Sequence, residues 1–196
     1  MADDATPTGD TDPPYAPERE HFSGYTHQEI WDRVHEVMDP AALDRAAAVW
    51  QANATALGEA FRAFSDATHR EFARWSGRTA DAAAQATRDF IRAGTDAHEV
   101  CAAIAALFEL DRDAAQTVRA AIPPPQPYRP LDDPAAEAVH GGQRRMDHDI
   151  AAAAVTADVQ DLMTHVYSPA IPASGDRVPR FAAPRTDPTG GGSAPL

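Results

Sequence analysis

The histidine and aspartate side chains between residues 140 and 149 are the first candidates for chemistry, because imidazole and carboxylate groups are common metal ligands. His140 and His148 lie eight residues apart on an expected helix, and Asp147 and Asp149 flank His148. Two side chains separated by two helical turns cannot share one ion without a ligand from another element. The usual zinc-motif spacings are absent. We therefore interpret these residues as solvated helix surface and expect no metal ion or cofactor.

A second group, Ser65, Asp66 and His69, places a nucleophile, an acid and a base within about one helical turn. Catalytic triads normally draw their members from separate elements around a concave site, and a helical rod offers no such pocket. The glycines at 190–192 have no strand before them and no helix after them, so they do not form a phosphate-binding loop. We therefore expect no enzymatic activity and assign no catalytic residue.

Two long apolar stripes flank Trp75-Ser76-Gly77, and both advance in alternating steps of four and three residues. This period keeps apolar side chains on one seam of a long helix. The stripes predict helices over residues 40–75 and 78–122, joined by a short turn at Trp75 and Gly77 into an antiparallel hairpin. Gly at such a turn supplies a positive φ. The stripes comprise Leu43, Ala47, Trp50, Ala54, Leu57, Phe61, Phe64, Thr68 and Trp75, and then Ala83, Thr87, Phe90, Gly94, Ala97, Cys101, Ile104, Phe108, Asp111, Ala115, Val118 and Ile122.

Local signals place two further helices around the hairpin. Thr26 and Glu29 form an S/T-x-x-E capping box at the start of a short helix. Asp39-Pro40 and Asp133-Pro134 are N-cap and first-turn signals, and the second of them begins a fourth long helix that ends near residue 167. The prolines at 123–125 and 127 end the preceding helix and predict an extended spacer.

The expected fold is all-α, with a single helical bundle domain over residues 23–167. Residues 1–22 are acidic and proline-rich, with few large apolar groups, so we expect a disordered arm. Residues 168–196 are rich in proline and glycine, and we expect an extended, disordered tail.

The 78–122 helix carries more apolar surface than one seam requires. A stripe this wide contacts two neighbours or leaves a patch that marks a binding site. The fourth helix, the short helix or another protein can provide the second neighbour. The candidate partner-binding face comprises Val100, Ile104, Leu107, Phe108 and Leu110.

The charge balance limits the classes of partner. The chain has 30 acidic and 17 basic residues, all of the latter arginine, and a net charge of −13. Such an acidic chain lacks the basic stripe that binds a nucleic-acid backbone or an anionic membrane surface. No apolar run approaches the roughly 20 residues that span a bilayer. The first residues lack the basic and apolar regions of a Sec signal peptide, so we expect no Sec-dependent export.

The run at residues 39–50, together with Leu57, Trp75-Ser76-Gly77, Ala80 and the alanines at 82–84, resembles the N-terminal domain of the PPE (Pro-Pro-Glu) proteins. More broadly, it is similar to the W-x-G superfamily of type VII (ESX) secretion substrates of actinobacteria. The resemblance covers residues 25–122 and, loosely, the fourth helix. Pro13-Pro14 is followed by Tyr15 rather than by glutamate.

This resemblance implies a helical bundle that is cytoplasmic before export, and secreted or held at the cell surface afterwards. It also implies a helical-hairpin partner of the PE type and contact with the ESX machinery or its chaperone. The superfamily's export signal, Tyr-x-x-x-Asp/Glu, matches Tyr128 with Asp132 and, more weakly, Tyr25 with Glu29. We prefer Tyr128 and Asp132, which follow the hairpin and which the proline spacer is expected to hold away from the bundle. A signal carried by the partner, and a cytoplasmic scaffold or adaptor without export, remain the alternatives.

Overall fold

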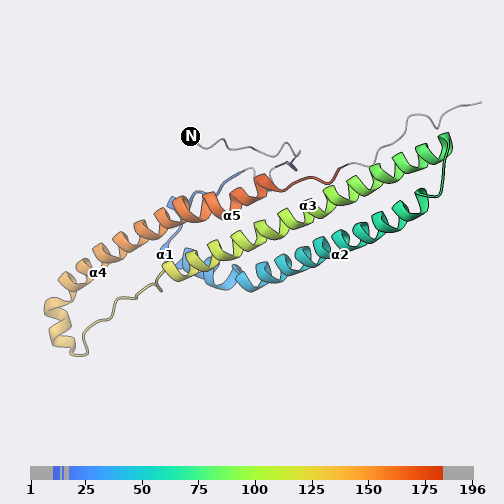
Figure 1. Ribbon diagram of the computed structural model, residues 1–196. Coiled ribbons are helices and arrows are strands. Elements are labelled where there is room, and N and C mark those ends of the chain that lie inside the picture. Colours follow the sequence, from blue (N-terminus) through green and yellow to red (C-terminus); the bar gives the residue numbers. More distant parts are fainter. Residues whose placement is uncertain (1–10, 14, 16–17, 183–196) are drawn as a thin grey trace, which may run out of the picture.

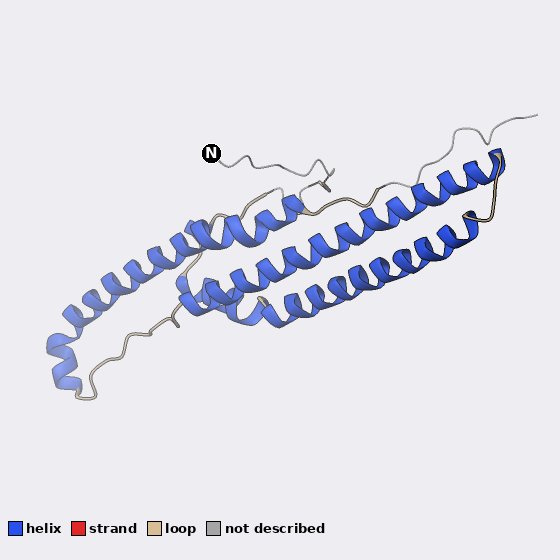
Figure 2. Ribbon diagram, in the orientation of Figure 1, coloured by secondary structure: helices blue, strands red, loops and turns tan. Residues whose placement is uncertain are grey.

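The computed structural model describes residues 11–13, 15 and 18–182, and every regular element among them is helical (Figure 2). Thr11 and Pro179 add one isolated antiparallel bridge. The prediction of an all-α chain is therefore confirmed for the described residues. The elements are η1 (Phe22–Gly24), α1 (His27–Asp32), η2 (Arg33–Val37), α2 (Pro40–Phe72), α3 (Arg78–Ala121), α4 (Pro134–Leu162), η3 (Met163–Tyr167), α5 (Ser168–Ser174) and η4 (Gly175–Arg177).

The sequence signals for helix starts are present at three of these elements. Thr26 and Glu29 form the predicted capping box at α1. The side chain of Asp39 accepts a hydrogen bond from the Ala41 amide at the start of α2, and Asp133 caps α4 in the same way. In both longer helices a proline occupies the first turn, where its missing amide proton costs no hydrogen bond.

The two longest helices, α2 with 33 residues and α3 with 44, lie side by side (Figure 1). Their contacts run in opposite order along the two sequences. Near one end, the guanidinium of Arg112 donates to Asp44 at 2.8 Å. Further along, Nδ1 of His98 contacts the Ala54 carbonyl oxygen at 2.7 Å. Small side chains allow this close approach, since the buried residues of α2 are Ala47 and Ala54.

The main hydrophobic core lies at the end of the pair where α1, η2, η3 and the last turns of α3 and α4 meet. Phe22 is buried there, with its ring edge-on to Tyr167 at 5.7 Å between centroids. The composition of residues 1–22 predicts a disordered arm that includes Phe22, and this boundary is wrong because the ring anchors the end of the arm in the core. The core comprises Phe22, Ile30, Val34, Val118, Ile122, Val159 and Met163.

The helical path after α4 continues through η3 and α5, so the prediction of an extended tail from Ser168 is wrong for residues 168–177. The helix continues through Pro172 because packing against the rest of the chain stabilises this segment. The buried hydroxyl of Ser174 donates to Asp111 of α3 at 2.8 Å. Arg19 pairs with Asp176 at 2.6 Å, so the arm and the tail lie together. The remaining arm and tail residues, 1–10, 14, 16–17 and 183–196, lie outside the described residues.

Candidate protein-interaction site

Trp75 and Gly77 lie in the connection between α2 and α3. The heptad spacing predicts that Trp75 continues the first apolar stripe, but α2 ends at Phe72 and the Trp75 side chain is 59% exposed. Its ring packs edge-on against Phe72 at 5.7 Å, and its amide donates to the Phe72 carbonyl at 3.1 Å. Trp75 therefore leaves the seam because the chain has already begun to reverse.

Gly77 has φ 99° and ψ 170° and is the residue immediately before α3. This conformation is essentially restricted to glycine. A methyl group at this position would meet no atom within 4 Å. The requirement for glycine here therefore comes from the backbone conformation and not from lack of space.

An aromatic cluster of Phe61, Phe64 and Phe90 lies across the α2–α3 pair near its turn. The ring centroid of Phe90 is 5.2 Å from that of Phe61 and 5.6 Å from that of Phe64. Phe90 is 56% exposed and Phe64 is 40% exposed. Figure 1 shows this end of the pair extending beyond α4 and α5. The two exposed rings thus form an apolar surface on a two-helix rod.

The predicted partner-binding face on α3 does not form one exposed surface. Ile104 is buried, whereas Val100, Leu107 and Phe108 are half-buried. Leu110 is 55% exposed. The structure therefore leaves Leu110 available on this face and largely covers Ile104.

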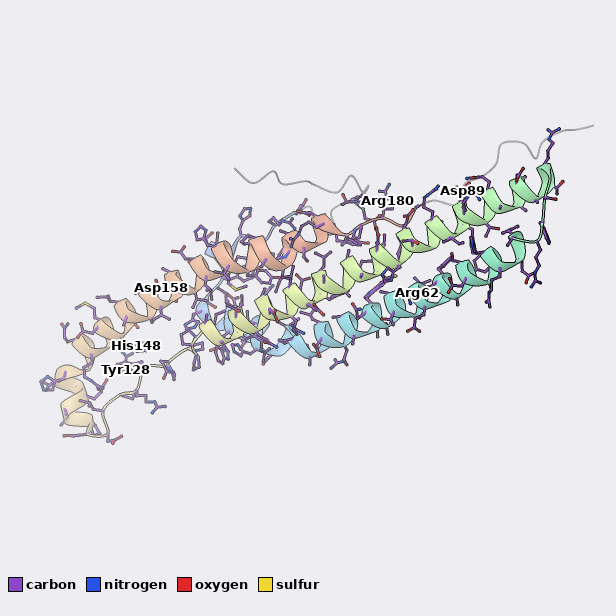
Figure 3. The ribbon with its side chains drawn as sticks, in the orientation of Figure 1. Arg62, Asp89, Tyr128, His148, Asp158 and Arg180 are labelled. Atoms are coloured by element: carbon purple, nitrogen blue, oxygen red, sulfur yellow. The ribbon has the colours of Figure 1, made fainter. Side chains whose placement is uncertain are left out.

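Tyr128 is held against α4 and not away from it. Its hydroxyl donates to Oε1 of Glu137 at 2.8 Å. The guanidinium of Arg145 lies 4.9 Å from its ring centroid, and the His148 ring approaches edge-on at 5.6 Å (Figure 3). The expectation that the proline spacer holds Tyr128 clear of the helices is wrong, because these side chains of α4 bind it. Asp132 is exposed.

Glu137 and His148 fix the rest of the loop to α4. The second carboxylate oxygen of Glu137 accepts from the Leu131 amide at 2.8 Å, and the Leu131 and Tyr128 donors lower the pKa of Glu137. Nε2 of His148 lies 2.9 Å from the Gln126 carbonyl oxygen, and this contact, followed by Asp149, raises the pKa of His148. Burial and the bond to Glu137 raise the pKa of Tyr128. The loop is thus bound to α4 through Gln126, Tyr128 and Leu131, and also through the Arg129 carbonyl, which accepts from Arg144.

The second candidate pair, Tyr25 and Glu29, serves local structure. The Glu29 carboxylate accepts from the Thr26 amide at 2.8 Å, and this bond lowers the pKa of Glu29. The Tyr25 ring packs on Phe22 at 6.0 Å, and the Arg33 guanidinium lies 4.6 Å above it. Both side chains are therefore already engaged at the start of α1.

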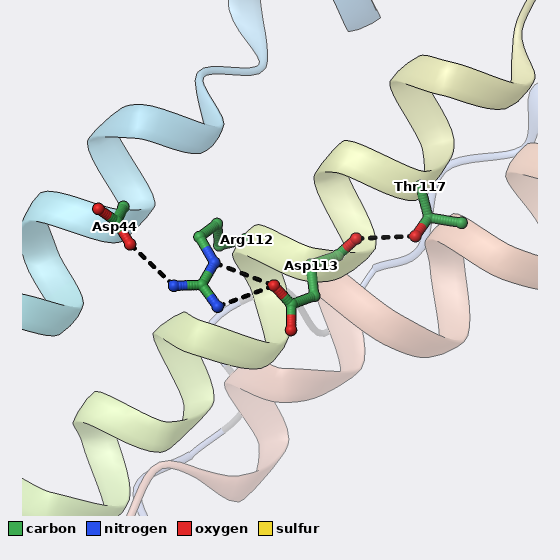
Figure 4. A network of polar contacts seen from close by, with 4 residues as sticks. All are labelled: Asp44, Arg112, Asp113 and Thr117. Carbon is green, nitrogen blue, oxygen red and sulfur yellow. Dashed lines mark hydrogen bonds and ion pairs between the residues drawn. The ribbon is translucent and has the colours of Figure 1, made fainter.

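Two arginines that belong to no sequence motif connect separate elements. Arg112 donates to Asp44 of α2 and to its neighbour Asp113, each at 2.8 Å, while Thr117 donates to the Asp113 carbonyl oxygen (Figure 4). The Arg119 guanidinium donates to the carbonyl oxygens of Val34, His35 and Met38, the last at 2.6 Å. No spacing in the sequence distinguishes them from other arginines of the helix surface.

Within the described part of the chain, no group of three or more histidine, cysteine, aspartate or glutamate side chains is arranged to hold a metal ion. Among the same residues, no helix combines the length and the apolar character that crossing a membrane requires. Comparisons with family models, curated proteins and solved structures give no match.

Proposed function

We propose that this chain is a non-enzymatic, PPE-like protein of a type VII (ESX) secretion pathway, which pairs with a helical partner and is exported as a folded hairpin. In this proposal, α2 and α3 are the two arms of the W-x-G hairpin, and Trp75 and Gly77 form its turn. The observation that carries the proposal is the exposed aromatic surface of Phe64 and Phe90 near that turn.

The aromatic surface is suited to helix-on-helix contact. Aromatic side chains bury large apolar areas and are enriched in the cores of protein interfaces. The neighbouring ring of Phe61 lies in the groove that Gly94 leaves on α3. A PE-like helical hairpin laid along this part of α2 and α3 would bury the rings of Phe64 and Phe90 and complete a four-helix arrangement.

Pairing is tested by purifying the chain with a co-encoded PE-like protein and measuring the mass of the complex by light scattering. Phe90→Glu should abolish the complex, because it places a charge at the centre of the apolar surface. Val37→Glu makes the same charge change at a side chain that is 77% exposed on η2, and it should leave the complex intact. A complex that survives Phe90→Glu, or no complex with any such partner, contradicts the proposed pairing.

Export is tested by following the chain in the culture medium of a host with an intact ESX system and of one without it. The proposal requires secretion only in the first host. Tyr128→Ala should abolish secretion and Tyr25→Ala should not, with circular dichroism showing that both variants remain helical. If Tyr128→Ala is secreted normally, the signal is carried by the partner.

The second candidate function is a cytoplasmic helical scaffold or adaptor that uses the same hairpin without export. The hydrogen bond between Tyr128 and Glu137 favours this alternative, because it engages the hydroxyl that a free export signal would present. The alternative expects pairing with a helical protein in the cell and no ESX-dependent appearance in the medium.

A further inference from the structure

The two faces of α4 have different environments. On one face, Glu137, Arg144 and His148 contact the preceding loop. The same face continues, in steps of three and four residues, into Val155, Val159 and Leu162, which pack in or against the core. The first half of α4 extends beyond the end of α3 (Figure 1). This face is therefore occupied along the whole helix, first by the loop and then by the core.

The opposite face of α4 carries an exposed apolar stripe. Val139 is 74% exposed, Met146 is 52% exposed and Ile150 is 64% exposed. Their spacings of seven and four residues place them on one side of the helix, where Ala153 and Ala157 continue the row. At 1.5 Å per residue, the three large side chains extend over about 17 Å. A partner helix of about three turns is sufficient to cover them.

We propose that this stripe, Val139, Met146 and Ile150, is a docking site for an amphipathic helix with basic residues beside its apolar row. The charge of the stripe's borders supports this partner. Asp147 and Asp149 are exposed on either side of the line between Met146 and Ile150. Asp149 lies 3.3 Å from Nδ1 of His148, and Asp147 accepts from the side-chain amide of Gln143, while the guanidinium of Arg145 lies over the ring of Tyr128. Lysine or arginine at the flanking positions of a partner helix would neutralise the two carboxylates.

The same charges disfavour a second copy of this chain as the occupant. Two copies of α4 packed along this stripe would place Asp147 and Asp149 of one copy beside those of the other. Each whole chain also carries a net charge of −13, so the two copies repel one another. A basic partner is attracted both by the two carboxylates and by the net negative charge of the chain.

The loop that contains Tyr128 gives this half of α4 a rigid support. Tyr128 and His148 connect the loop to the face opposite the stripe. A helix held on one face loses less conformational freedom when a partner binds the other, which favours binding. This docking site lies on α4, apart from the α2–α3 surface of the proposed function, and it does not depend on export.

The test uses the full-length chain and three labelled synthetic peptides, each about three heptads long. The first carries leucine at the seam positions and lysine at the flanking positions, the second replaces lysine with glutamate, and the third has the first peptide's composition in scrambled order. Fluorescence anisotropy measures binding of each peptide. We expect the first peptide to bind and the other two to bind at least about tenfold more weakly.

Two variants with the same charge change distinguish docking at the stripe from non-specific electrostatic attraction between the peptide and the acidic chain. Ile150→Glu should weaken binding of the first peptide at least about tenfold. Val49→Glu, at a side chain that is 59% exposed on α2, should leave it unchanged. The double change Asp147→Asn and Asp149→Asn should weaken it several-fold. Equal weakening by Ile150→Glu and Val49→Glu, equal binding of the scrambled peptide, or no binding of the first peptide overturns the proposal. A dimer in light scattering that Ile150→Glu dissociates also overturns it, in favour of a second copy.

Discussion

The hydroxyl of Tyr128 donates a 2.8 Å hydrogen bond to the carboxylate of Glu137, nine residues later in the chain. The other oxygen of the same carboxylate accepts from the amide of Leu131, between the two residues in sequence. One carboxylate therefore closes the loop that leads from α3 to α4 onto the first turns of α4. This arrangement also determines whether Tyr128 is available to another protein.

Glu137→Ala should release the loop while leaving the α2–α3 pair intact. The Leu131 amide loses its acceptor, so its hydrogen exchange should accelerate, whereas exchange in α3 should not change. If Tyr128 is an export signal that must be free, Glu137→Ala should also increase secretion above that of the parent chain. The exposed carboxylate of Glu109 on α3 gives the matched control, Glu109→Ala, which should alter neither quantity. Unchanged exchange at Leu131 would contradict the proposed role of Glu137.

The attachment of the loop at His148 should depend on pH. The pKa of His148 is raised by the Gln126 carbonyl and by Asp149, so the charged imidazole is favoured when the loop is bound. A raised pKa contributes stability that is fully present below the unfolded value of about 6.5 and is lost as pH rises through the folded value. Chymotrypsin cleavage of the Tyr128–Arg129 bond should therefore be slowest under mildly acidic conditions and faster above neutral pH, after correction for the protease's own pH profile.

His148→Gln removes the titrating group and retains a side-chain donor for Gln126. Its rate of chymotrypsin cleavage after Tyr128 should be nearly flat over the same pH range. His140→Gln, at an exposed position on the same helix, serves as the control and should keep the pH dependence of the parent chain. A parent chain without this dependence would rule out His148 as a contributor to loop attachment.

The starts of the helices follow from local chemistry and are predictable from the sequence. Thr26, Asp39 and Asp133 each bind amides of the first turn through their own side chains, so the signal and the contact lie within a few residues. The all-α class follows in the same way from the heptad stripes.

The loop attachment and the C-terminal helix depend on contacts between distant residues. Ser168, Pro169 and Pro172 discourage a helix locally, and α5 exists because Ser174 and its neighbours pack on α3. Tyr128 likewise follows a proline-rich run that predicts an extended spacer, and contacts with Glu137, Arg145 and His148 keep it on α4. Local propensity gives no information about such contacts, and therefore the ends of the bundle were the least predictable parts.

The groove at Gly94 should make the α2–α3 pair sensitive to one methyl group. A Cβ at this position would overlap the ring of Phe61. Gly94→Ala should destabilise the chain by about 1–3 kcal/mol through overpacking, less the gain in helix propensity of up to about 1 kcal/mol. Gly142→Ala is the control, since a Cβ there meets no atom within 4 Å, and it should be neutral or slightly stabilising. Urea denaturation measures both; an equal change for the two variants would refute a steric role for Gly94.

Gly77 provides a different test, because its backbone and not its surroundings requires glycine. With φ 99° and ψ 170°, it lies in a region that side-chain-bearing residues almost never adopt, at a cost of about 1–3 kcal/mol. Gly77→Ala should lower the free energy of unfolding in urea by this amount. Gly77→Asn should be no better, since asparagine tolerates the left-handed helical region but not this one. Gly24→Ala, at a glycine with neither a positive φ nor a close neighbour, is the control and should be nearly neutral.

The response of Gly77 also determines how the W-x-G turn is to be interpreted in an export assay. If Gly77→Ala destabilises the chain as expected, destabilisation alone can explain a loss of secretion in that variant. Such a loss then gives no information about recognition of the turn by the export machinery. Trp75→Ala is then the more informative change, because the ring is 59% exposed and its removal leaves little space inside the structure. A Trp75→Ala chain that retains its unfolding free energy but is not secreted would assign recognition to the indole. Normal secretion of that chain would restrict the turn to a structural role.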